Sequence, residues 1–118
     1  MRALALICFL ACAAAGQSPI QQAPAAVSAK TNPLAGRERA VRAGAKLYQR
    51  ECASCHGATG EGGLGKAPPL RQVEIYRASP GALFWVLRNG SLAHGMPSFA
   101  HLPEPERWQI ITWLQTRP

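Results

Sequence analysis

The sequence contains no aspartate, only six carboxylate side chains and only four cysteines. All six acids are glutamates, so metal or protease chemistry that depends on paired aspartates is excluded. They are outnumbered by 13 lysines and arginines, which give a formal charge of +7. With 118 residues, 47% of them hydrophobic, the chain has room for one folded domain. The functional interpretation depends on where the cysteines lie, at Cys8, Cys12, Cys52 and Cys55.

The first apolar run is too short to cross a membrane. It extends from Ala3 to Ala15 after Arg2, whereas a transmembrane helix needs about 20 apolar residues. A positive residue, a short apolar stretch and small residues are typical of a secretory signal, with cleavage after Ala15 or Gly16. The alternative is an uncovered apolar terminus on a cytosolic protein. Removal of residues 1–16 would discard Arg2 and lower the charge from +7 to +6.

Cys12 offers a second interpretation of the same segment. The preceding residues 9–11 faintly resemble a bacterial lipobox, and lipidation of Cys12 would make residues 13–36 a tether. Residues 17–36 are rich in Gln, Ala, Ser and Pro, which predicts a flexible leader. The predicted organisation is a signal peptide at 1–16, a flexible leader at 17–36 and a folded domain at 37–118.

The domain shows helical periodicity and no strand pattern, which predicts an all-α fold. From Arg37 to Cys52, apolar side chains repeat at spacings of three and four on one face. The opposite face carries a basic stripe, made of Arg39, Arg42, Lys46 and Arg50. That stripe either attracts an acidic partner or is a solvated helix back. Further helices are predicted around 71–77, over 80–88 with Ser79 as N-cap, and from Glu104 or Pro105 to about Gln115. Trp85, Trp108 and Trp113 are interpreted as core aromatics.

Residues 52–56, Cys-Ala-Ser-Cys-His, have the C-x-x-C-H spacing of covalent c-type haem attachment. Cysteines at i and i+3 lie on one side of a helical turn, so Cys52 and Cys55 can both reach the vinyl groups along one porphyrin edge. His56 then offers a ring nitrogen to the iron. Three alternatives are a zinc site, which lacks further cysteines, a thioredoxin-like dithiol, which expects a βαβ setting, and an ordinary disulfide.

A second iron ligand is available in a later loop. Apart from the initiator, Met96 is the only methionine, and it lies in the loop sequence of residues 94–99. A thioether is a soft ligand that favours ferrous iron, so Met96 is the candidate sixth ligand; a loosely buried methionine is the alternative. His94 or His101 could ligate in its absence, although each also fits a solvated loop histidine.

Together these motifs resemble those of the class I, single-haem cytochromes c over about residues 37–117. The matching pieces, beside the haem motif, are Gly44 with Tyr48, Pro68-Pro69-Leu70, Gly95-Met96-Pro97-Ser98-Phe99, and Ile110 with Trp113-Leu114. The resemblance implies a small all-α class I cytochrome c fold with covalent haem c in its core. It also implies that the N- and C-terminal helices cross at Gly44, because glycine lets two backbones approach closely.

The resemblance also assigns roles to single residues. The carbonyl of Pro68 or Pro69 would accept the ring N–H of His56, Leu70 would pack on the haem, and Phe99 would cover an edge. His56 and Met96 would be the two iron ligands. The complete predicted haem-binding set is Cys52, Cys55, His56, Pro68, Leu70, Met96 and Phe99.

These features predict an exported, periplasmic single-electron carrier rather than an enzyme. The alternatives are a haem-bearing subunit of a larger dehydrogenase or oxidase complex and, if the iron kept an open position, a peroxidase or gas sensor. The basic charge favours redox partners with acidic docking surfaces, and the chain is expected to be a monomer. No nucleic-acid partner is expected, since no recognition motif is present. Membrane association would require lipidation of Cys12 or an uncleaved signal.

Overall fold

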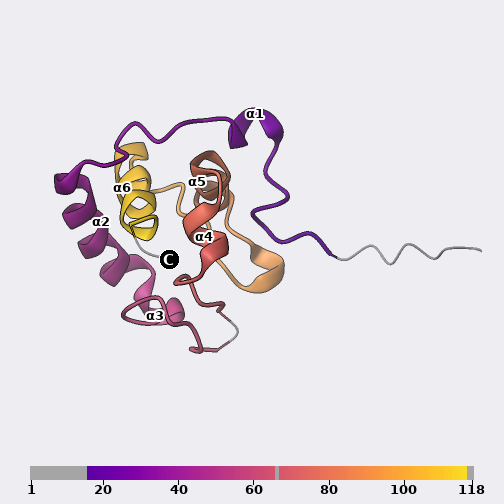
Figure 1. Ribbon diagram of the computed structural model, residues 1–118. Coiled ribbons are helices and arrows are strands. Elements are labelled where there is room, and N and C mark those ends of the chain that lie inside the picture. Colours follow the sequence, from indigo (N-terminus) through magenta and orange to yellow (C-terminus); the bar gives the residue numbers. More distant parts are fainter. Residues whose placement is uncertain (1–15, 66, 117–118) are drawn as a thin grey trace, which may run out of the picture.

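A computed structural model describes residues 16–65 and 67–116 (Figure 1). Most of the predicted signal peptide, including Cys12, lies outside the described residues. The expected all-α fold is confirmed: within the described part, strand-like pairing is confined to one bridge between Ser91 and Met96. None of the helices in that part is long and apolar enough to span a membrane. The elements are α1 (Ala25–Ser28), α2 (Glu38–Glu51), α3 (Ala53–His56), α4 (Val73–Arg77), α5 (Pro80–Asn89), the 3-10 helix η1 (Leu92–His94) and α6 (Glu104–Leu114).

Helices α2 and α6 cross at Gly44, and this crossing forms the centre of the fold (Figure 1). A Cβ atom added at Gly44 would overlap the backbone carbonyl of Gln109 and lie 2.9 Å from Trp113 Cβ. The Tyr48 and Trp113 rings pack beside this contact with their centroids 4.3 Å apart. Tyr48 is fully buried, as are Ile110 and Ile111 from the facing helix. The absence of a side chain at Gly44 therefore allows the two helices to touch.

Helix α5 begins where the sequence predicts. The Ser79 hydroxyl accepts a hydrogen bond from the backbone N–H of Ala82 at 3.4 Å, and Pro80 occupies the first helical position. The next four residues of α5 are all buried. One of them, Phe84, stacks on Trp108 of α6, with ring centroids 4.2 Å apart and an interplanar angle of 16°. These contacts attach α5 to the α2–α6 pair and fix the start of the chain segment that leads to Met96.

The three tryptophans are not equivalent. Trp108 is buried in the core, as the sequence predicts. Trp113 is only partly buried and packs on the edge of the core cluster, and Trp85 is also only partly buried. Arg107, by contrast, is buried beside Trp108, and its guanidinium carbon lies 4.6 Å from the centroid of the Phe84 ring. The core near the start of α6 therefore combines the stacked Phe84 and Trp108 rings with the Arg107 guanidinium next to Phe84.

Residues 17–36, whose composition predicts a flexible leader, are called the N-terminal strap here because they contact the helices of the domain. They contain α1, which packs against the start of α5 (Figure 1). A Cβ atom at Gly81 would overlap the carbonyl of Val27, so the backbones touch there. Farther along, the Asn32 side-chain amide donates to the Thr112 hydroxyl of α6 at 2.8 Å. Small residues and one amide give the strap these contacts, and composition alone does not reveal them.

Candidate functional site

The motif cysteines lie on a single helical turn. Cys52 ends α2 and caps α3, and its carbonyl accepts hydrogen bonds from the backbone N–H groups of Cys55 at 3.2 Å and His56 at 3.0 Å. The two cysteines and His56 therefore lie on one hydrogen-bonded helical turn, as the spacing of three predicts. Both thiols are free; Cys52 is buried and Cys55 is exposed.

Burial changes the chemistry of the first cysteine. Loss of solvent, together with smaller contributions from the nearby Glu51 carboxylate and Cys55, raises the pKa of Cys52 to about 12. Cys52 therefore remains a protonated thiol at neutral pH, a form that reacts poorly as a nucleophile and resists oxidation.

The His56 ring is oriented by a backbone carbonyl. Its Nδ1 lies 2.8 Å from the carbonyl oxygen of Pro68. A carbonyl can only accept, so Nδ1 carries the proton and the lone pair resides on Nε2. The sequence left open whether Pro68 or Pro69 has this position. The structure shows the Pro68 carbonyl at His56, while the Pro69 carbonyl accepts from the Gln72 side chain at 2.7 Å.

Tyr48 links this turn to the helix crossing. Its hydroxyl donates a 2.7 Å hydrogen bond to the carbonyl of Gly57, the residue that follows His56. The pKa of Tyr48 is raised to about 12, mainly by burial; nearby Cys52 and Glu61 contribute to the rise, and Arg71 opposes it. The hydroxyl is therefore a constant donor at physiological pH, and it fixes the end of α3 against the core.

Met96 lies in a second, separately ordered segment, the Met96 loop (residues 90–99). Ser91 and Met96 exchange two backbone hydrogen bonds of 2.9 and 3.0 Å. Gly90, with φ of +67°, precedes them, and a Cβ there would come within 2.7 Å of the Met96 carbonyl oxygen. Only glycine fits this close approach without strain. The loop also returns to α5, because the Phe99 backbone N–H donates to the Leu87 carbonyl at 2.8 Å.

One hydrophobic cluster connects most of the predicted haem set. Cys52 and Phe99 are buried members of it, and Leu70 and Met96 pack against it while partly exposed. The predicted residues outside the cluster are Cys55, His56 and Pro68, which adjoin it through the α3 turn and the His56–Pro68 hydrogen bond. Segments more than 40 residues apart in sequence, at Cys52 and Met96, thus meet in one core.

The two other histidines lie on the surface of the described domain. His94 is exposed, and its Nδ1 lies 2.7 Å from the Ser91 hydroxyl within the Met96 loop. His101 is also exposed, with its ring centroid 6.0 Å from that of Phe99. Both positions agree with solvated loop histidines.

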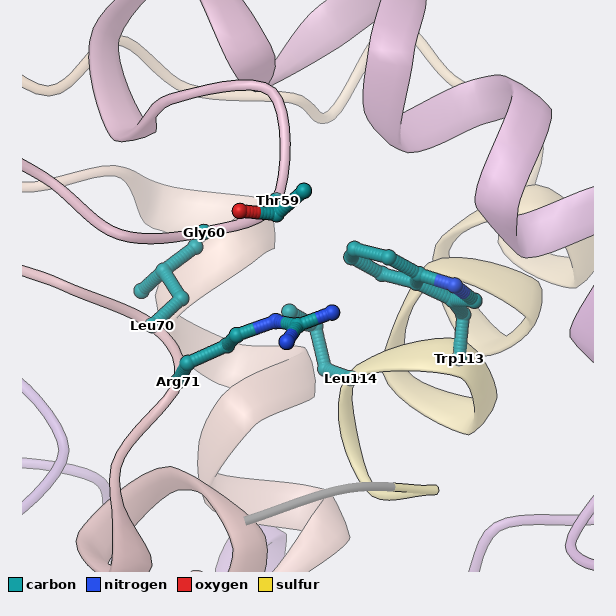
Figure 2. A pocket seen from close by; sticks show the side chains of 6 residues that line it. All are labelled: Thr59, Gly60, Leu70, Arg71, Trp113 and Leu114. Carbon is teal, nitrogen blue, oxygen red and sulfur yellow. The ribbon is translucent and has the colours of Figure 1, made fainter.

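The segment after α3 is a glycine-rich loop (residues 57–65). A small pocket between this loop, the residues that follow it and α6 contains residues that the sequence did not single out (Figure 2). Figure 2 shows the Arg71 side chain extending between Leu70 and the α6 residues Trp113 and Leu114. Of the predicted haem set, only Leu70 lines this pocket. The sequence contained one signal that Arg71 lies near the site, namely its position directly after Leu70. The pocket is lined by Thr59, Gly60, Leu70, Arg71, Trp113 and Leu114.

Comparison with known proteins identifies the family. The model of the family described as "Cytochrome C oxidase, cbb3-type, subunit III" matches residues 39–114, which include the α3 turn and the Met96 loop. The chain belongs to this family of class I c-type cytochromes. The resemblance stated from the sequence motifs is therefore confirmed.

Similar proteins include both separate cytochromes and part of a larger protein. The cytochrome is 36% identical over 95 residues to the quinohemoprotein alcohol dehydrogenase ADH-IIG of Pseudomonas putida, covering 78% of this chain but only 12% of the dehydrogenase. Cytochrome cL of Methylophaga aminisulfidivorans is 25% identical with a TM-score of 0.61, over 71% of this chain and 57% of that one. The c-type cytochrome XoxG of Methylobacterium extorquens is 26% identical with a TM-score of 0.57, over 66% and 50%.

The donor groups of this cytochrome fit a covalent haem with two axial ligands. Two free thiols on one turn suit thioether links to one porphyrin edge. The Nε2 lone pair of His56 is available because Pro68 holds the proton on Nδ1. Met96 supplies a thioether from a loop that its own backbone hydrogen bonds order.

Proposed function

We propose that this cytochrome is a single-electron carrier with one haem c, held through thioethers to Cys52 and Cys55 and ligated by His56 and Met96. The observation that carries the proposal is the α3 turn, in which two free thiols accompany a histidine whose Nε2 is free. When bound, haem c supplies one reversible electron by cycling between ferric and ferrous iron.

The protein's own residues would set the behaviour of that electron. Pro68 keeps the proton of His56 on Nδ1 and so preserves a strong nitrogen donor at Nε2. A methionine thioether on the other side favours the ferrous form and raises the reduction potential. The buried cluster around Cys52 and Phe99 would exclude water, which also favours the less charged ferrous centre. If His56 and Met96 both held the iron, they would leave it no open site for peroxidase or gas-sensing chemistry.

Covalent attachment can be tested by mass. Denaturing mass spectrometry of the protein, produced with a cytochrome c maturation system, should show the chain plus one haem that acid–acetone extraction does not remove. Cys52→Ser and Cys55→Ser should each lose one thioether and shift the pyridine haemochrome spectrum, and the double variant should retain no covalent haem. A wild-type mass without haem would refute the proposal.

The exported location belongs to the same proposal. The apolar segment from Ala3 to Ala15 supports secretion into the periplasm, where the haem would be attached and where the partners would be other redox proteins. N-terminal sequencing of the mature protein would distinguish cleavage after Ala15 or Gly16 from a lipidated Cys12, and a cytosolic protein with an intact Met1 would contradict export.

The match to ADH-IIG supports a second candidate, a haem subunit that works within a dehydrogenase complex. In that relative, the segment similar to this cytochrome is 12% of a quinohaemoprotein chain. A subunit would co-purify stoichiometrically with a larger redox protein from native membranes or periplasm at physiological salt. A free carrier would elute as a monomer. Added redox partners would then fully reduce or oxidise its haem.

A further inference from the structure

Arg107 of α6 has a buried guanidinium group with unused hydrogen-bonding capacity. Only 8% of the residue is exposed, and its Nε and Nη1 atoms are buried without a hydrogen-bond partner among the described residues. The carboxylates in the first turn of α6 do not pair with it: Glu104 is exposed, and Glu106 lies 3.8 Å from Arg50. A buried cation without an anionic partner is unfavourable, so the Arg107 guanidinium is suited to bind an anion.

Lys30 of the N-terminal strap brings a second positive charge to the same place. Its Nζ atom lies 5.8 Å from the centroid of the Phe84 ring, and the guanidinium carbon of Arg107 lies 4.6 Å from that centroid. Trp108 stacks on one face of the ring, so both cations lie over the face that remains. The ring attracts each cation but does not cancel the repulsion between them. The two side chains therefore form a pair of like charges that an anion can bridge.

The contacts between the strap and α5 determine the position of Lys30. The Ser79 hydroxyl donates a hydrogen bond to the carbonyl of Ser28, and the backbone of Val27 touches that of Gly81. The Lys30 backbone N–H donates to the Val27 carbonyl at 3.0 Å, which fixes the chain just after α1. The residue itself is exposed, so an ion can reach its ammonium group from solvent. The pair thus has a buried half on α6 and an accessible half on the strap.

We propose that Lys30 and Arg107 form a binding site for a small phosphate-like oxyanion, which fastens the N-terminal strap to α6. Arginine offers a planar fork of donors and lysine a mobile point charge, and one oxyanion has enough oxygens to accept from both. Because so little of Arg107 is exposed, the site suits a small free ion rather than a broad charged surface. The family match begins at residue 39, so the Lys30 half of the site lies outside the family domain.

Hydrogen exchange of the strap provides the test. The backbone N–H groups of Ser28, Ala29 and Lys30 all donate within the strap, and their exchange can be followed by NMR on the reduced, haem-loaded protein. Inorganic phosphate is titrated against chloride at the same pH and ionic strength, and its dissociation constant is fitted from the shifts. At about ten times that constant, phosphate should slow exchange of these amides about tenfold, because the ion binds the closed strap and not the open one.

Matched variants separate this site from a general effect of charge. Lys30→Ala should abolish the response to phosphate, whereas Lys30→Arg, which keeps the positive charge, should retain it. Lys46→Ala is the control, because it removes an exposed cation from α2 and should leave the response within about twofold of wild type. Equal exchange in phosphate and chloride, or an equal loss of the response in Lys30→Ala and Lys46→Ala, would overturn the proposal. Neither Lys30 nor Arg107 belongs to the predicted haem-binding set, so such a result would leave the proposed electron-transfer function standing.

Discussion

Gly44 is the position where one added methyl group should have the largest effect on the fold. In Gly44→Ala, the new Cβ would overlap the Gln109 backbone carbonyl and lie 2.9 Å from Trp113 Cβ. Neither obstacle is the end of a flexible side chain, so rotation cannot relieve the overlap. The helices α2 and α6 would have to move apart, which would loosen the packing of Tyr48 against Trp113.

Two effects of opposite sign decide the size of the change. Alanine is favoured over glycine inside a helix by about 1 kcal/mol. Overpacking a dense core costs about 1–3 kcal/mol, and a backbone obstacle at Gly44 points to the upper end of that range. The expected net loss is about 2 kcal/mol of unfolding free energy. For a domain of this size, that corresponds to a melting temperature about 8–16 °C lower.

The assay is thermal and guanidinium unfolding of the haem-loaded protein, followed by far-ultraviolet circular dichroism. Lys46→Ala is the control, because Lys46 is exposed on the same helix and the change should stay within about 0.5 kcal/mol. A midpoint for Gly44→Ala that equals or exceeds that of wild type would show that the crossing is looser than the structure indicates.

Two further predictions follow from single hydrogen bonds, and a third follows from the burial of Tyr48. Asn32→Ala removes the 2.8 Å bond to Thr112 and should lower the unfolding free energy by about 1 kcal/mol. Gln21 is exposed on the same strap, so Gln21→Ala should change the unfolding free energy little. Equal unfolding midpoints for the two variants would contradict the contact between the strap and α6. Tyr48→Phe removes the bond to the Gly57 carbonyl and should cost about 1–2 kcal/mol, measured by guanidinium unfolding at pH 7. Because the folded pKa of Tyr48 is raised to about 12 from 10.0, wild-type stability should fall as pH rises through that window. Tyr48→Phe should fall less steeply there, and identical alkaline profiles would argue against the burial of this hydroxyl.

Periodicity and capping in the sequence predict the main helices well. The apolar spacing over residues 37–52 corresponds to α2, and the Ser79-Pro80 start corresponds to α5. Such signals are local, because a helix places residues three and four apart on one face whatever it packs against. The α2–α6 crossing was available only through the family resemblance, since the contact joins positions more than 60 residues apart.

The contacts of the strap could not be predicted from its composition. The segment 17–36 has the residues of a flexible linker, yet Val27 touches the backbone at Gly81 and Asn32 bonds to α6. The burial of Arg107 was equally hidden, because a charged residue in a helix is normally placed on the solvent side. Its position depends on the Phe84 ring, which belongs to another helix. Tertiary partners of this kind leave no local pattern.

The haem motif predicts the site more fully than any other part of the sequence. The C-x-x-C-H spacing of the motif determines which residues share the α3 turn. The structure adds that the carbonyl of Pro68 is the one that orients His56. The ordering of the Met96 loop by Ser91 and the exposure of Leu92 had no sequence signal, because both depend on the path of the backbone.

The most direct measurement is the near-infrared spectrum of the oxidised protein, recorded for wild type and for Met96→Ala under the same conditions. Ligation by His56 and Met96 predicts a methionine-to-ferric-iron charge-transfer band in wild type that disappears in the variant, together with a lower reduction potential. A wild-type protein without the band, or a band that persists in Met96→Ala, would contradict the proposed ligand pair.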